Sequence, residues 1–141
     1  MSENLLVPYD GSDPAKDALT YALERFPDPK VTVLHVVQVP EGYWSAFGGK
    51  KERVPGYEEA AARGEELLEE ASQLAEESGA DVETELEAGE AQRVIVDRAE
   101  EGDFDSVVIG SHGRKGVTRV MMGSVAEKVV RRAPIPVVVV R

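Results

Sequence analysis

The sequence contains no cysteine, which excludes disulfides, thiolate metal sites and thiol catalysis. No apolar run approaches the roughly 18 residues that a membrane-spanning helix needs, and the first four residues lack the basic start and apolar core of a signal peptide. Positive charge is also scarce, since 27 acidic residues stand against 16 basic ones and the formal net charge is −11. Nucleic-acid binding needs a basic face. We therefore expect a cytoplasmic protein with no nucleic-acid partner and no membrane contact.

The acidic residues are concentrated in pairs of neighbouring glutamates, at positions 58–59, 65–66, 69–70 and 76–77. We interpret these pairs as the solvated face of a helix. So acidic a surface would also suit a salt-rich cytoplasm, where counterions relieve the repulsion between like charges. This halophilic hypothesis predicts that the denaturation midpoint rises between low and molar salt, and a midpoint that did not rise would remove it.

Apolar runs and turn residues predict that strands and helices alternate in a single domain over residues 1–141. We expect strands near residues 4–10, 31–37, 81–87, 106–109 and 137–140, with helices opening after Ser12 or Asp13, near Tyr57, after Gly89 and at Gly123-Ser124. Such alternation builds right-handed βαβ crossovers and a mostly parallel sheet. The predicted fold class is therefore α/β, a doubly wound three-layer sandwich.

Local patterns place some residues within this fold. Residues 81–87 alternate apolar and acidic side chains, which predicts a strand at the edge of the sheet. The buried stripe of the long helix is predicted to begin at Ala60, and that of the last helix to include Val130. Residues 38–55 form a long loop with three aromatic side chains. These could cover a ligand, meet a partner subunit or pack on the domain's own surface, and the last is the default.

Residues 107–125 are where we expect the function to lie. A short apolar run ends in Gly110, and Gly113 and then Gly123-Ser124 follow before a helix. Glycines expose backbone amides and tolerate positive φ, and a helix N-terminus attracts anions, so this stretch could hold a phosphate. No Walker loop and no dinucleotide fingerprint is present. From the residues alone, a nucleotide cradle and a structural strand-to-helix turn both stay open.

The residues around these glycines have two readings as well. Arg114 and Lys115 could pair with phosphate oxygens or be solvated. Ser124 and Glu127 have the spacing of a capping box, which would use the Ser124 hydroxyl to cap the helix, although that hydroxyl could instead reach a phosphate. If the first and fourth strands are neighbours, residues 8–10 and 110–113 face one crevice at the carboxyl edge of the sheet.

The spacing Gly110-x₂-Gly113-x₉-Gly123-Ser124 matches, without a gap, the ATP-binding motif Gly-x₂-Gly-x₉-Gly-Ser/Thr of the universal stress protein family. The chain also resembles that family in its opening Leu-Val-Pro-Tyr-Asp-Gly-Ser, in Leu-His-Val of the second strand and in its closing Pro-Val-Val-Val-Val. The resemblance covers the whole chain apart from residues 38–55. It implies a Rossmann-like, adenine nucleotide alpha hydrolase-like fold with five parallel strands in the order 3-2-1-4-5.

The resemblance also implies a ligand and a partner. The ligand would be ATP, often with a divalent cation such as Mg or Mn bridging its phosphates. The partner would be a second copy, forming a homodimer through the last strand, Val137 to Val140. An independent argument agrees, because these valines would otherwise form an exposed apolar edge. The family resemblance thus predicts a homodimeric stress-response or signalling module.

Carried onto this sequence, the resemblance implies a set of nucleotide-binding residues. Adenine and ribose would lie against Pro8, Asp10 and the backbone of Val36. The phosphate side would comprise Ile109, Gly110, Ser111, His112, Gly113, Arg114, Lys115, Gly123, Ser124 and Val125. No nucleophile, base and orienter set is visible and no histidine–carboxylate cluster has metal-ligand spacing. We therefore expect no catalytic residue and no metal ligand from the protein, and at most weak ATP hydrolysis.

Alternative readings remain for single residues and for the function. Asp10 either contacts the ligand, which we favour, or forms the turn before Gly11-Ser12. His112 is either a phosphate donor or solvated, and His35 is predicted to be packed or hydrogen-bonded, not a ligand. A dimer of the same fold that binds no nucleotide is the runner-up function. An ATP-consuming enzyme of the alpha hydrolase group would need Ser-Gly-Gly-x-Asp-Ser after the first strand, where this chain has Asp-Gly-Ser-Asp.

Overall fold

Strands and helices alternate along the residues that this computed structural model describes, which are 3–39, 50, 54–111 and 123–141. In chain order the elements are β1 (Glu3–Pro8), α1 (Asp13–Arg25), β2 (Pro29–Gln38), α3 (Tyr57–Glu77), β3 (Val82–Gly89), α4 (Ala91–Glu101), β4 (Ser106–Gly110), α5 (Ser124–Arg132) and β5 (Val137–Val140). Most of the predicted loop 38–55 lies outside the described residues.

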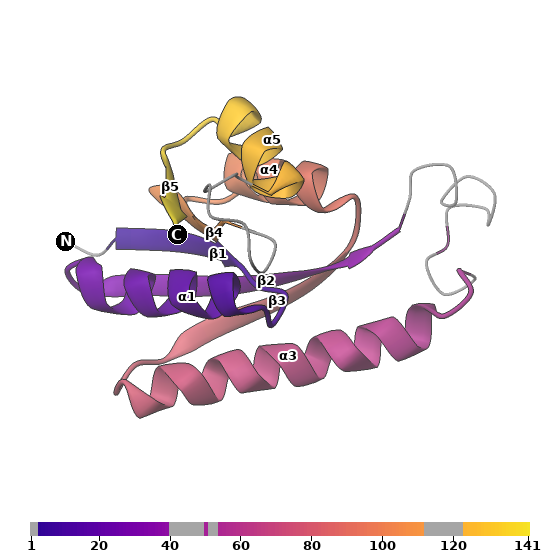
Figure 1. Cartoon of the computed structure of the whole chain (residues 1–141), viewed down its shortest axis with the longest axis horizontal. Helices are drawn as coiled ribbons and strands as arrows, with labels where there is room; N and C mark the ends of the chain where they lie inside the picture. The colour runs from indigo at the N-terminus through magenta and orange to yellow at the C-terminus, as the bar shows by residue number, and fades with distance from the viewer. Residues whose placement is uncertain (1–2, 40–49, 51–53, 112–122) are drawn as a thin grey trace.

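The strands form one parallel sheet in the order β3-β2-β1-β4-β5. Helices α1 and α3 cover one face of the sheet, and α4 and α5 cover the other (Figure 1). The predicted doubly wound α/β sandwich is therefore confirmed, and so are the strand order and the edge position of β3. No helix in the described part of the chain is long and apolar enough to cross a membrane.

The central strand β1 is apolar because both of its faces are covered. Leu5 and Val7 lie in the cluster beneath α1 and α3, whereas Leu6 lies in the cluster beneath α4 and α5. All three side chains are completely buried. An uninterrupted apolar run is what a strand buried on both faces requires.

Two helix ends have typical capping residues, and the one at Ser12 was predicted. Ser12 caps α1, and its Oγ accepts a hydrogen bond from the N–H of Ala15 at 3.3 Å. At the end of α3, Gly79 has φ +76, and its N–H donates to the carbonyl of Glu76 at 2.9 Å. A glycine in the left-handed region just after the last turn is a common way to end a helix.

Of the two interpretations left open for Ser124, the capping box does not hold. The N-cap residue of α5 is Gly123, which has no side chain to cap the helix. Ser124 already lies inside the helix, and the carboxylate of Glu127 pairs with Arg131 on the following turn at 2.8 Å. The start of α5 is therefore one residue earlier than the box requires.

Two predicted core residues are exposed. Ala60 lies in the first turns of α3, which reach past the ends of the strands (Figure 1), so the sheet does not cover it. Val130 is 40% exposed, while its neighbour Val129 is buried. Successive helix residues point about 100° apart, and α5 is covered on one side only.

Helix α4 is held against the edge strand by an ion pair. Arg98 donates two hydrogen bonds to the carboxylate of Glu85 on β3, at 2.6 and 2.8 Å. These hydrogen bonds lower the pKa of Glu85 and raise that of Arg98. The guanidinium also lies 5.2 Å from the ring centroid of Phe104. The pair fixes the position of α4, whose first turns border the site described next.

Candidate functional site

A cavity of about 430 Å³ opens at the carboxyl ends of β2, β1 and β4. It lies where the strand order reverses, since β1 leads to β2 on one side and lies next to β4 on the other. Ligands of doubly wound sheets bind at such switch points, and the volume suits a small molecule. Its lining residues are Pro8, Tyr9, Asp10, Ala15, Leu34, His35, Val36, Val37, Gln38, Ala60, Arg63, Leu67, Ala91, Ile95, Ile109, Gly110 and Val125.

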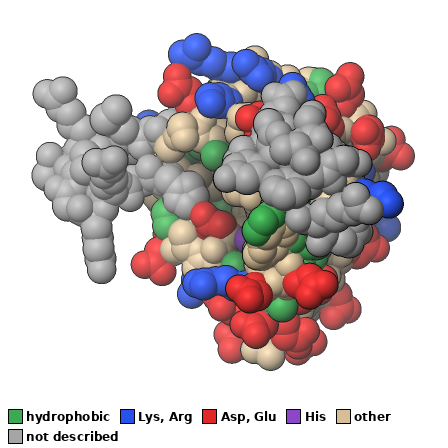
Figure 2. All heavy atoms as spheres, turned by 90° about the vertical axis from the view of Figure 1, so that its right-hand side faces the viewer, with side chains coloured by type: hydrophobic (Ala, Val, Ile, Leu, Met, Phe, Trp, Pro, Cys, Tyr) green, Lys and Arg blue, Asp and Glu red, His purple; other side chains and the backbone are tan. Residues whose placement is uncertain are grey.

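The face that carries this cavity has a mixed surface. Figure 2 looks onto the carboxyl ends of the strands, and Asp and Glu side chains gather at the lower edge of this view, over α3. The cavity lining is different, because most of the side chains there are apolar. An apolar pocket with a few polar groups is the usual form of a small-molecule site.

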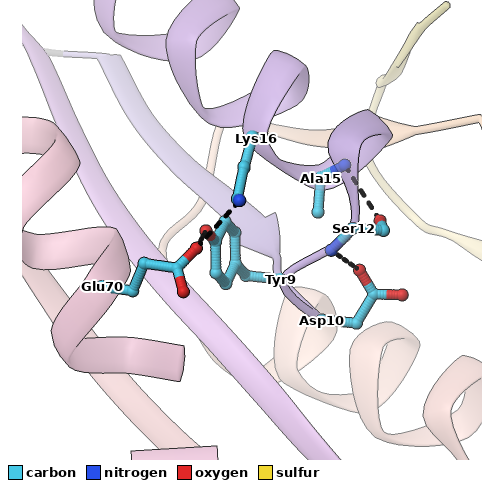
Figure 3. A network of polar contacts seen from close by, with 6 residues as sticks. All are labelled: Tyr9, Asp10, Ser12, Ala15, Lys16 and Glu70. Carbon is cyan, nitrogen blue, oxygen red and sulfur yellow. Dashed lines mark hydrogen bonds and ion pairs between the residues drawn. The ribbon is translucent and has the colours of Figure 1, made fainter. Parts of the chain in front are cut away.

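Tyr9 ties the cavity to the two helices on its side of the sheet. Its side chain is 3% exposed, and its hydroxyl donates to Oε1 of Glu70 at 3.0 Å (Figure 3). Nζ of Lys16 lies 3.2 Å from the same oxygen. Burial, followed by the bond to Glu70, raises the pKa of Tyr9, while the bonds from Lys16 and Tyr9 lower the pKa of Glu70. Tyr9 is therefore a neutral core phenol that links β1, α1 and α3.

His35 is positioned by hydrogen bonding and packing, as predicted. Its Nδ1 lies 2.8 Å from the carbonyl oxygen of Tyr9. Because a carbonyl only accepts, Nδ1 carries the proton in this bond. On α3, a Cβ added to Gly64 would lie 2.7 Å from Cδ2 of His35, so α3 passes close to the imidazole only because residue 64 is glycine. Both contacts fix the ring at the wall of the cavity.

Asp10 both shapes a turn and lines the cavity. Its Oδ1 accepts a hydrogen bond from the N–H of Ser12 at 3.0 Å (Figure 3). Gly11 between them has φ +80, a conformation that favours glycine. The turn-forming reading of Asp10 therefore holds for this oxygen, and the residue also borders the cavity as the ligand reading requires.

Gly110 is a glycine for a reason that the sequence did not reveal. Its φ does not lie in the positive range that favours glycine. A Cβ at this position would instead collide with the carbonyl group of Pro14 and lie 2.9 Å from the nitrogen of Ala15. The missing side chain makes room for the first turn of α1. Glycine is therefore needed at position 110 for close packing and not for a positive φ.

The N-terminus of α5 lies at the β4 side of the cavity. Gly123 has φ −62, which again needs no glycine, and the first bond within the helix runs from the N–H of Glu127 to its carbonyl at 2.9 Å. The N–H groups of Ser124, Val125 and Ala126 precede that bond, and among the described residues no side chain caps this end of the helix. Val125 lines the cavity. Backbone donors and the positive end of a helix dipole therefore lie beside it.

The structure places the predicted site residues in three groups. Those that line the cavity are Pro8, Asp10, Val36, Ile109, Gly110 and Val125. Ser111 is buried next to them, with its N–H bonded to the carbonyl of Val140 at 2.8 Å, and Gly123 and Ser124 begin α5. His112, Gly113, Arg114 and Lys115 lie outside the described residues.

Helices α3 and α4 supply lining residues that sequence reasoning missed. Ala91 and Ile95 on α4 were not predicted as site residues, and the acidic pairs of α3 were interpreted as the solvated face of a helix. Arg63 is the most informative of the missed residues, because it brings a cation to the cavity. A signal was present in the sequence, since Arg63 is the sole basic residue of α3.

Within the described ranges, no group of three or more His, Asp or Glu side chains could hold a metal ion. A pocket at the switch point of a doubly wound sheet, with a helix N-terminus beside it, is the geometry in which α/β proteins commonly hold small ligands. The model of the universal stress protein family matches residues 1–141, and the chain belongs to this family.

Similarity to individual proteins supports the same family assignment. The chain is 33% identical over 149 residues to universal stress protein MJ0531 of Methanocaldococcus jannaschii, covering 99% of this chain and 82% of that protein. The solved structure of UspA from Lactobacillus plantarum superposes with a TM-score of 0.76 at 28% identity, over 99% of this chain and 97% of that one. A universal stress protein from Archaeoglobus fulgidus, solved in complex with dAMP, gives a TM-score of 0.71 at 28% identity, over 100% and 98% of the two chains.

Proposed function

We propose that this chain binds ATP in the cavity at the carboxyl ends of β1 and β4 and acts as a homodimeric stress-response module. One observation carries the proposal, which is the apolar cavity with the uncapped N-terminus of α5 beside it. A nucleotide matches this arrangement, because its flat aromatic base suits the apolar cavity and its anionic phosphates suit the helix N-terminus. The Archaeoglobus fulgidus relative solved with dAMP supports an adenine nucleotide as the ligand.

The described residues fit the two ends of such a ligand. The amides at the start of α5 would take the phosphates, as helix N-termini commonly do. Leu34 and Val36 on β2, with Ile95 on α4, would surround the base with apolar groups. Mg or Mn would neutralise charge on the phosphates and would be held mainly by them, because the described His, Asp and Glu side chains form no group of three or more that could hold a metal ion.

The cavity favours holding the nucleotide over hydrolysing it. Oδ1 of Asp10 accepts a hydrogen bond from the N–H of Ser12, and Nδ1 of His35 donates one to the carbonyl of Tyr9. Both side chains therefore already stabilise the fold. At most weak hydrolysis and a cytoplasmic location stay predictions from the sequence.

Saturating ATP is expected to raise the melting temperature of the purified protein. A ligand at about 100 times its Kd stabilises the folded state by about 2.7 kcal/mol. For a domain of this size, that corresponds to a rise of roughly 8 °C. Differential scanning fluorimetry with ATP, with and without Mg, measures it, and inorganic tripolyphosphate is the control for the base. If ATP left the melting temperature unchanged in both conditions, the chain would be an interaction module that binds no nucleotide.

The homodimer part of the proposal rests on β5. This strand lies at the edge of the sheet, pairs with β4 on one side, and its four valines are only partly buried. An apolar edge strand with unpaired backbone groups is a site for pairing with another chain. We expect sedimentation equilibrium to give the mass of a dimer for the unaltered chain. Val139→Lys should give a monomer, because it places a charge on the strand proposed to pair with the second copy, and the similarly shaped Val139→Thr should remain dimeric. A monomeric unaltered chain would refute the dimer.

A further inference from the structure

Arg63 differs in charge from every other ionised side chain of its helix, α3. Helix α3 has 21 residues, all of its other charged side chains are glutamates, and none of the paired glutamates lines the cavity. Arg63 does line it. It is also the sole Lys or Arg in the described lining of the cavity. An acidic helix therefore presents its one cation where the ligand would bind.

The backbone of α3 holds Arg63 at this place. Ala60, Arg63 and Leu67 are three and four residues apart, a spacing that puts them on one helix face, and all three line the cavity. Gly64 lets the helix pass close to β2 and β3, since a Cβ there would lie 2.7 Å from His35 and from Leu86. Further along the helix, Glu70 is bonded to Tyr9 (Figure 3). The part of α3 that follows residue 63 is thus held in place by contacts at residues 64 and 70.

Arg63 lies at the opposite end of the cavity from α5. Helix α3 packs on β2 and β3, whereas α5 follows β4, and β1 lies between β2 and β4 in the sheet. A nucleotide whose phosphates meet the amides of α5 directs its base toward β2. Arg63 on α3 is therefore on the side of the cavity where the base would lie, and the start of α5 is on the side of the phosphates.

We propose that Arg63 is a base-recognition residue of this site, an inference that rests on the proposed adenine-nucleotide binding. A guanidinium is planar, carries donors only and stacks on aromatic faces. The ring nitrogens of adenine are acceptors and its face is aromatic, so Arg63 complements either the edge or the face of the base. The side chain is exposed at the rim, so its replacement leaves the core intact.

The test is isothermal titration of adenosine, ATP and inorganic tripolyphosphate into the unaltered protein, Arg63→Ala and Arg63→Lys. Arg25→Ala is the charge-matched control, because Arg25 lies in the last turn of α1, outside the cavity lining. Arg63→Ala is expected to weaken the binding of adenosine and of ATP by the same factor, about fivefold. A loss of this size is typical of a cation removed from an aromatic ring. Tripolyphosphate binding should not change. Arg63→Lys should recover only part of the loss, since lysine keeps the charge without the planar group.

Three outcomes overturn the inference, and they are distinguishable. If the unaltered protein binds ATP and Arg63→Ala binds it equally well, base recognition by Arg63 is refuted while the proposed function stands. If Arg63→Ala weakens the binding of tripolyphosphate and ATP but leaves the binding of adenosine unchanged, Arg63 contacts the phosphates and not the base. If the unaltered protein binds neither ATP nor adenosine, the proposed function fails, and the assignment of Arg63 fails with it.

Discussion

Ser124→Glu is expected to weaken ATP binding by roughly 100-fold without unfolding the protein. Ser124 is exposed at the first position of α5, so a glutamate there meets no core atom. A carboxylate in the first turn of a helix is favourable for the helix itself. Against a phosphate about 4 Å away, however, one like charge costs up to about 4 kcal/mol near a protein surface, before screening by solvent and salt.

The matched control is Ser124→Gln, which has nearly the same size as glutamate and no charge. We expect it to keep ATP binding within a few-fold of the unaltered protein, as measured by isothermal titration, while both variants melt near the unaltered temperature. Equal affinities of the Glu and Gln variants would mean that no phosphate lies near the start of α5. The proposed orientation of the nucleotide would then be wrong, and Arg63 would lose its place at the base end.

Gly110→Ala is expected to destabilise the fold by about 3 kcal/mol, at the upper end of what overpacking costs. The added methyl group collides with the backbone of Pro14 and Ala15 rather than with a flexible side chain. That backbone cannot retreat easily, because Ser12 caps the turn and Ala15 is itself buried against the sheet. Either β4 or the first turn of α1 must move, and both border the cavity.

Gly79→Ala provides a useful comparison for this variant. Gly79 has φ +76 and no atom within 4 Å of its added Cβ, so alanine there meets backbone strain without a collision. Strain of this kind costs about 1 kcal/mol. Urea denaturation of the two variants separates the two causes. A loss for Gly110→Ala no larger than that for Gly79→Ala would show that α1 yields readily, and that the close contact at Gly110 is unimportant.

The order of strands and helices could be predicted because its signals are local. Apolar runs marked the strands, alternation with acidic residues marked β3, and Ser12 marked the start of α1, which the structure confirms. The start of α5 was less predictable. The same sequence is compatible with Ser124 as the N-cap of a capping box and with a helix that begins one residue earlier. The backbone conformation of Gly123 decides between the two.

The candidate site could be predicted only along the ends of the strands. Pro8, Asp10, Val36, Gly110 and Val125 were assigned by the family resemblance. Pro8, Asp10 and Gly110 also lie at the ends of predicted strands, where the ligands of such sheets bind. The contributions of α3 and α4 could not be found in this way. A helix that is amphipathic gives no sign of which of its turns passes the mouth of a cavity.

The sequence by itself determined that this is a universal stress protein with a doubly wound sheet and a glycine motif before its last helix. Periodicity and spacing are properties of residues close together in the sequence, so they can be recognised without knowledge of the fold. Only the tertiary structure decided why residue 110 must be glycine and that Arg63 belongs to the cavity. Both depend on how closely a helix approaches a strand that is distant in the chain, and that distance is set by packing, which no local pattern records.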